Sequence, residues 1–121
     1  MEKKYKELVI NRCYGGFGLS RKAFLRLREL GNECALNEPD IGEYWSDGSG
    51  PREESFDVFC FDIPRDDPDL IKVVRELGKE ANSRFADLAI VQIPADADYK
   101  IYEYDGIEWV VYCEDGKLKE V

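Results

Sequence analysis

Leu8–Arg28 reads LVINRCYGGFGLSRKAFLRLR. Three consecutive β-formers open this stretch, a glycine-bearing turn follows, and apolar residues then recur at helical spacing. We therefore predict a strand, a tight turn and the first helix of the fold. The stretch holds five of the chain's 17 lysines and arginines and none of its 26 acids. One end of an acidic protein is thus positive around a glycine-rich loop.

The strand is predicted over residues 5–13, and its run of three apolar residues indicates burial on both faces. The glycines that follow let the backbone turn tightly or adopt a positive φ. The helix is predicted to begin after Ser20, a good N-cap residue, and to stop at Gly31.

The remaining elements follow from periodicity and turn residues. They are a mobile loop over about 32–54, a strand over 55–63, a helix over 68–82 that Asp67 caps, and strands over 86–93, 99–104, 107–113 and 117–121. Asp105-Gly106 between two of these strands is a strong signal for a type I′ hairpin turn. We predict one α+β domain over residues 1–121, a two-layer sandwich with a mostly antiparallel sheet and two helices on one face.

Composition limits the classes of function. A chain of 121 residues with 44% hydrophobic content forms one folded core. No apolar run reaches the roughly 20 residues that span a bilayer, and the N-terminus lacks the apolar segment of a signal peptide, so we expect a cytosolic protein without membrane contact. A net charge of −9 disfavours general nucleic-acid binding but leaves room for a local anion site.

The residue types that carry most catalysis are scarce. The chain has no histidine, which excludes Ser-His and Cys-His pairs. Cys13, Cys34, Cys60 and Cys113 form no CxxC pair and lie in or beside apolar stretches. They are predicted to be free, buried thiols, with a metal site or a disulfide as the alternatives. We expect a protein without cofactor or metal and favour a non-enzymatic role, while an enzyme remains the alternative.

The turn and the start of the first helix form a candidate anion site. A strand that leads through a glycine turn into a helix presents free N–H groups and the positive end of the helix dipole. The predicted ligand-binding residues are Arg12, Tyr14, Gly15, Gly16, Phe17, Gly18, Ser20, Arg21, Arg28 and, from the NSRF segment, Phe85. The spacing matches neither a P-loop nor a GxGxxG fingerprint.

Two other interpretations of the same stretch remain open. The helix cations could pair with residues 33–69, which hold twelve acids and two arginines, or with a partner subunit. The stretch could also be a surface that docks a protein.

Two further clusters have structural explanations. Asp62, Asp66, Asp67 and Asp69 resemble a metal or acid–base group, but helix capping accounts for the last two. The aromatic residues of the C-terminal strands are typical of cross-strand packing, with stacking of a base as the alternative. These are Tyr99, Tyr102, Tyr104, Trp109 and Tyr112.

The phrases VINRCYGGFGLS, RDDPDLIKVVRELG, FADLAIV and EYDGIEWV resemble small phage- and prophage-borne proteins of unassigned function. The likeness covers about half of the chain and is most specific at Cys13–Ser20. It implies a compact α/β accessory protein expressed inside a bacterial host. The terminal CEDGKLKEV departs from the basic and aromatic tail of the family, so a ligand contact made by that tail is not carried over.

Small phage proteins of this size include sponges that sequester cyclic nucleotide signals, an analogy at the level of size and origin. We therefore expect a non-enzymatic phage accessory protein, homo-oligomeric in the host cytoplasm, that binds a phosphate-bearing small molecule and counters a nucleotide defence signal. The alternative is an acidic inhibitor that docks on a host protein as a nucleic-acid mimic.

Overall fold

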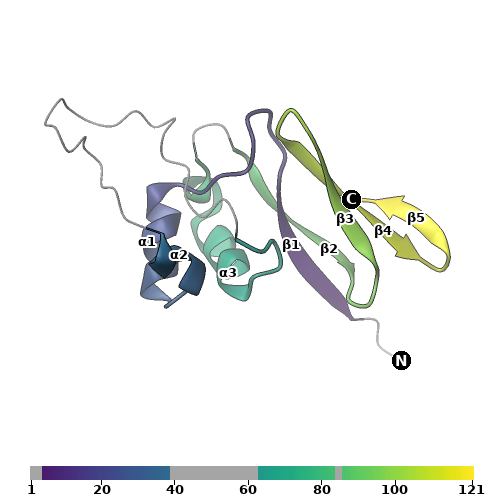
Figure 1. The fold of residues 1–121 in the computed structure, drawn as a ribbon, viewed down its shortest axis with the longest axis horizontal. Helices are drawn as coiled ribbons and strands as arrows, with labels where there is room; N and C mark the ends of the chain where they lie inside the picture. The colour runs from purple at the N-terminus through teal and green to yellow at the C-terminus, as the bar shows by residue number, and fades with distance from the viewer. Residues whose placement is uncertain (1–3, 39–62, 84–85) are drawn as a thin grey trace, which may run out of the picture.

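The computed structural model describes residues 4–38, 63–83 and 86–121 (Figure 1). The helical elements in these ranges are α1 (Arg21–Glu29), α2 (Glu33–Asn37), α3 (Pro68–Leu77) and the 3₁₀ turn η2 (Gly78–Ala81). The strands are β1 (Tyr5–Asn11), β2 (Leu88–Pro94), β3 (Tyr99–Tyr104), β4 (Ile107–Glu114) and β5 (Lys117–Glu120).

The described strands form two antiparallel sheets, β1-β2 and β3-β4-β5. The helices lie on one side of β1-β2 and the three-stranded sheet lies on the other (Figure 1). This arrangement follows from β1, where Leu8, Val9 and Ile10 are all fully buried. Because successive side chains of a strand point to opposite faces, a strand buried on both faces needs a cover on each.

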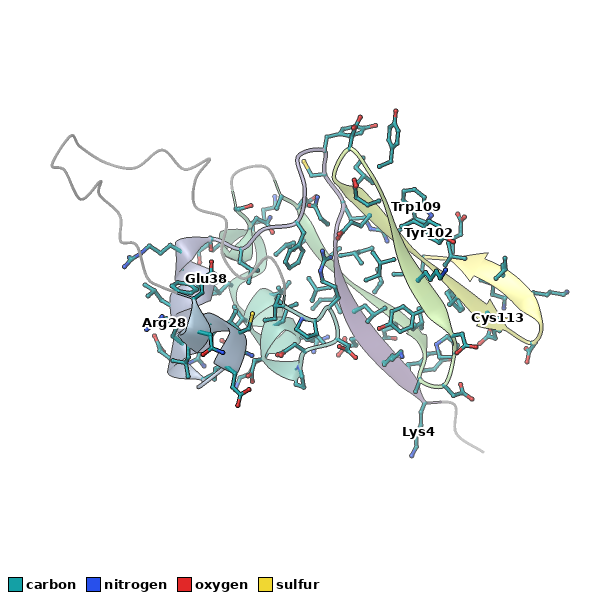
Figure 2. All side chains as sticks on the ribbon, in the orientation of Figure 1. Lys4, Arg28, Glu38, Tyr102, Trp109 and Cys113 are labelled. Atoms are coloured by element: carbon teal, nitrogen blue, oxygen red, sulfur yellow. The ribbon has the colours of Figure 1, made fainter. Side chains whose placement is uncertain are left out.

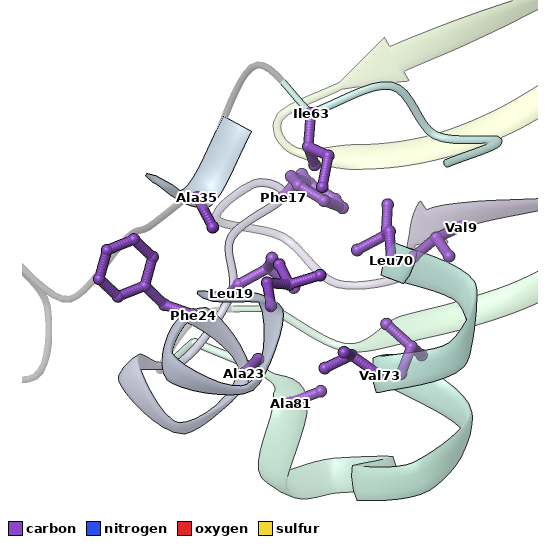
Figure 3. Close-up of a cluster of buried hydrophobic side chains, with 12 residues drawn as sticks. Val9, Phe17, Leu19, Ala23, Phe24, Ala35, Ile63, Leu70, Val73 and Ala81 are labelled. Atoms are coloured by element: carbon purple, nitrogen blue, oxygen red, sulfur yellow. The ribbon is translucent and has the colours of Figure 1, made fainter. Parts of the chain in front are cut away.

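The helical layer covers the Val9 face of β1-β2. Its core combines Val9 with apolar residues of α1 and α3 and with Phe17, Leu19 and Ile63 from the connecting segments (Figure 3). The α1 and α3 helices begin where the sequence predicts. The Ser20 side chain accepts a hydrogen bond from the Ala23 N–H, and the Asp67 side chain caps α3.

The three-stranded sheet covers the opposite face. Leu8 and Ile10 of β1 and Val91 and Ile93 of β2 pack on Val110 of β4. Tyr99, Ile101 and Tyr112 add to this second core from the inner face of the sheet. Successive side chains of β3 and β4 therefore point alternately toward this core and away from it, as expected for a sheet with one buried face.

Both hairpin turns of this sheet place an Asp-Gly pair at positive φ. Asp105 and Gly106 have φ of 49° and 96°, and Asp115 and Gly116 have φ of 54° and 76°. Positive φ at both central residues defines the type I′ turn, so the Asp-Gly prediction is confirmed.

The α+β class and the antiparallel pairing are confirmed, and the finer arrangement differs in three places. The described strands make two sheets instead of one, because both faces of β1 are apolar. The α3 helix ends at Leu77, short of the predicted 82, because Gly78 has a φ of +58° and begins a 3₁₀ turn.

The third difference is α2, within the predicted mobile loop 32–54. The Asn32 side chain accepts from the Ala35 N–H, and the Arg28 guanidinium donates to the carbonyls of Ala35 and Glu38. These bonds hold a short helix at residues 33–37. Residues 39–54 of that loop, and the predicted strand over 55–63 apart from Ile63, lie outside the described residues.

Candidate functional site

The glycine turn after β1 is held against the turn between β3 and β4. The Gly15 N–H donates to the Asp105 carbonyl at 3.0 Å. A Cβ added to Gly106 would lie 2.2 Å from the Gly16 nitrogen, far inside van der Waals contact. Gly15 and Gly16 have φ of 120° and 107°, which side-chain-bearing residues rarely adopt. The glycines at this junction therefore allow two backbones to touch.

Asn11, the last residue of β1, holds the two turns together through hydrogen bonds of its buried side chain. Its Nδ2 donates to the carbonyls of Cys13 and Gly106, each at 2.7 Å, and its Oδ1 accepts from the Asp87 N–H at 2.8 Å. Asn11 is fully buried. Its side-chain bonds thereby satisfy the polar groups that its burial removes from water.

A buried ion pair lies beside Asn11. Arg65 makes two hydrogen bonds to the Glu108 carboxylate, and that between Nη2 and Oε2 measures 2.8 Å. Oε1 of Glu108 also accepts from the Asn11 N–H at 2.8 Å. The side chains of Arg65 and Glu108 are only 17% and 8% exposed. A bidentate arginine–carboxylate pair of this kind is strong and geometrically specific.

The backbone and a ring complete the surroundings of Arg65. The Val9 N–H donates to the Arg65 carbonyl at 2.9 Å, and Arg65 Nη1 donates to the Val9 carbonyl at 3.3 Å. The guanidinium lies 3.6 Å from the centroid of the Phe17 ring. One arginine thus contacts β1, β4 and the glycine turn together.

The start of α1 is occupied by the chain's own groups. The Ser20 hydroxyl accepts from the Ala23 N–H and donates to the Glu80 carbonyl at 2.6 Å. Lys22 forms an ion pair with the Glu80 carboxylate at 2.8 Å. The Glu80 carboxylate of η2 therefore lies where an anionic ligand was predicted. Because both side chains are exposed, the Lys22–Glu80 pair contributes little to stability.

The other cations of α1 also have partners. Arg26 bonds to Glu76 of α3 at 3.0 Å, and this hydrogen bond is the largest cause that lowers the pKa of Glu76. Arg28 donates to the Ala35 and Glu38 carbonyls and lies over the Phe24 ring. Figure 2 shows Arg28 beside Glu38 in the helical layer, well apart from the three-stranded sheet.

The predicted site residues therefore separate into groups. Arg12, Tyr14, Gly15 and Gly16 lie at the junction of the two turns. Phe17 and Gly18 are buried, Ser20 caps α1, and Arg21 is half-buried at its first position. Arg28 lies elsewhere, and Phe85 is outside the described residues.

The basic helix pairs with acids, and the described partners of Lys22 and Arg26 include Glu80 and Glu76, which lie outside the predicted segment 33–69. Seven of the twelve acids of that segment lie outside the described residues, so pairing with it stays a prediction. The prediction about the cysteines needs a correction. The described cysteines are free as predicted, yet none is fully buried, and Cys113 is exposed. Cys60 and Asp62 lie outside the described residues.

Two hollows among the described residues are lined by none of the predicted ligand-binding residues. One of about 390 Å³ lies between β1 and α3, near Glu7, Lys72 and Arg75. The other, of about 410 Å³, lies where α2 meets the start of α3. Residues 4–38, 63–83 and 86–121 contain no cluster of three or more metal-ligating side chains.

Sequence reasoning missed Asn11, Arg65 and Glu108. A signal existed for Glu108, because it shares a strand face with Val110 and Tyr112 in an alternating pattern. A single acid on an apolar face predicts a buried cationic partner. Nothing local in the sequence identifies Arg65 as that partner, since 42 residues separate the two in the chain.

No family model matches the chain, and neither a curated protein nor a solved structure matches it. Among the described residues, no helix is both long and apolar enough to cross a membrane.

The contact between the two turns predicts a large difference between two glycine substitutions. Gly116→Ala meets only left-handed strain, because open space surrounds its Cβ, and should cost about 1 kcal/mol. Gly106→Ala adds a backbone collision and should cost about 3 kcal/mol. Urea unfolding of both variants measures the difference, and equal losses would contradict the contact.

The ion pair predicts a second contrast, on two neighbouring glutamates. Glu108→Gln leaves the guanidinium of Arg65 buried without its counter-charge and should destabilise the fold by about 3 kcal/mol. Glu103, its cross-strand partner, is exposed, so Glu103→Gln should change stability by less than about 0.5 kcal/mol. Chemical denaturation of the two variants tests this, and a Glu108→Gln protein as stable as the parent would refute the pairing.

Proposed function

We propose that this protein is a non-enzymatic binding protein for a phosphate-bearing small molecule with an aromatic base, and that Arg12 and Tyr14 are its principal contacts. The observation that carries the proposal is that both residues belong to a turn whose backbone is fixed by its contact with the Asp105-Gly106 turn. Tyr14 directly precedes Gly15 and is 63% exposed. Arg12 is also exposed, and its guanidinium makes no bond to any described residue.

The two side chains have complementary chemistry for a nucleotide. A guanidinium binds phosphate oxygens through two parallel hydrogen bonds, and a tyrosine ring stacks on a base. Arg12 is anchored through its own N–H, which donates to the Asp87 carbonyl at 2.8 Å. Because the backbone of both residues is fixed before the ligand arrives, less conformational freedom is lost on binding.

Binding without turnover is the natural form of this proposal. Neither Arg12 nor Tyr14 is bonded to a carboxylate among the described residues, and a carboxylate is one of the partners that orient or activate a catalytic group. The resemblance to phage-borne proteins supports a place in the cytoplasm of a bacterial host, where nucleotide signals occur. Capture of such a signal is the role that we propose.

Titration calorimetry with cyclic and linear nucleotides tests the proposal. One charge-assisted contact contributes about 1.5–3 kcal/mol, so Arg12→Ala should weaken binding by about 10-fold to 100-fold. Tyr14→Ala should weaken it by a similar factor through lost stacking. Thermal unfolding of both variants should match the parent, because both side chains are exposed.

Two exposed residues away from the junction provide controls. Lys79→Ala removes a cation from η2, and Tyr5→Ala removes an exposed ring from the opposite end of β1. Neither should change nucleotide affinity. Absence of binding by every nucleotide would overturn the proposal and favour the acidic inhibitor. Equal losses of affinity in the control variants would also overturn it, because binding would then not depend on Arg12 and Tyr14.

A further inference from the structure

The three-stranded sheet has an outer face that no described residue covers. The inner face packs on β1-β2 through Tyr99, Ile101, Val110 and Tyr112, so the residues between them point outward. The outward apolar side chains are Tyr102, Tyr104, Ile107, Trp109, Val111 and Leu118. Tyr104 is 66% exposed and Leu118 is 78% exposed.

The centre of this face is ordered by aromatic stacking. Tyr102 and Trp109 are cross-strand partners, with ring centroids 5.9 Å apart and planes inclined by 17°. Figure 2 shows the two rings side by side on the sheet farthest from the helices. An exposed apolar face with stacked aromatic rings is typical of a surface that another protein covers.

Two opposite charges on this face, those of Lys100 and Glu120, favour a second copy of the chain as the partner. Lys100, Val111 and Glu120 are successive cross-strand neighbours, so one row carries a cation at one edge and an anion at the other. A two-fold rotation about an axis along β4 exchanges the two edges of the sheet. A second copy placed by that rotation sets its Glu120 opposite Lys100 and its Lys100 opposite Glu120, while Val111 meets Val111.

We propose that this face binds a second copy of the chain, related by a two-fold axis along β4. Two sheets packed face to face lie about 10 Å apart with strands inclined by about 30°, a spacing that lysine and glutamate side chains bridge. Nucleic acid fits the face poorly, because Lys100 and Glu120 cancel and the whole chain carries −9. This dimer does not depend on a ligand at Arg12.

The size of the face sets the expected affinity. Three strands about 4.8 Å apart with about 3.3 Å per residue give a surface below the roughly 800 Å² per partner of a standard interface. We therefore expect a reversible dimer that forms between about 10 and about 500 µM protein. Sedimentation equilibrium at about 0.15 M salt, which screens the long-range repulsion between two acidic copies, measures it.

Charge reversal at Lys100 and Glu120, singly and together, tests the proposed two-fold arrangement. Lys100→Glu and Glu120→Lys each place like charges opposite one another twice per dimer, and each should raise the dissociation constant at least about 10-fold. The double variant Lys100→Glu/Glu120→Lys restores both pairs and should return the constant to within about 3-fold of the parent. Both positions are exposed, so folding is preserved.

Lys79→Glu is the matched control, since it changes the net charge as Lys100→Glu does but lies on η2. It should leave the dissociation constant within about 3-fold of the parent. A protein that is monomeric over the whole concentration range overturns the proposal. Single variants that dimerise like the parent, a double variant that stays monomeric, or an equal loss in Lys79→Glu also overturn it.

Cys113 gives a second measurement. It is exposed, pairs with Leu118 on the outer face and lies on β4, so the two-fold axis brings it opposite its copy. A short bismaleimide that spans about 10 Å should cross-link the parent into a dimer and should fail with Cys113→Ser. Equal cross-linking of the two proteins would contradict the axis.

Discussion

The structure depends on the contact of Arg65 with Glu108, supported by Asn11. This ion pair joins the segment before α3 to β4, and the Asn11 N–H joins β1 to the same carboxylate. The three residues lie far apart in the chain, so no local interaction could fix the three layers in the same way. Because a charge with little exposure is costly without its partner, loss of either Arg65 or Glu108 destabilises this arrangement of the sheets.

This contact also explains the glycine turn. Once Asn11 and Glu108 hold β1 against β4, the turns that follow β1 and β3 are brought together, and only glycine fits between their backbones. The glycine turn therefore has a structural role in the contact between the two turns. A ligand at this place would have to contact the exposed side chains beside the glycines. Arg12 and Tyr14 are those side chains, whereas Arg28 serves the helical layer.

Features set by neighbouring residues were predictable from the sequence. The Ser20 and Asp67 caps, the Asp105-Gly106 turn and the burial of Leu8–Ile10 on both faces each follow from a few adjacent residues. Features set by distant residues were not. The Arg65–Glu108 pair joins residues 43 positions apart, and α2 depends on the guanidinium of Arg28 on the preceding helix. The division into two sheets likewise depends on what covers each face of β1.

Native-state hydrogen exchange at the Asn11 amide tests the central contact most directly. That N–H donates to the Glu108 carboxylate, and the nearby Val9 N–H donates to the Arg65 carbonyl. If the contact holds the layers together, both amides exchange only through global unfolding, with the free energy that urea denaturation gives. Exchange of either amide through a local opening, at a free energy more than about 1 kcal/mol below the global value, would contradict the account.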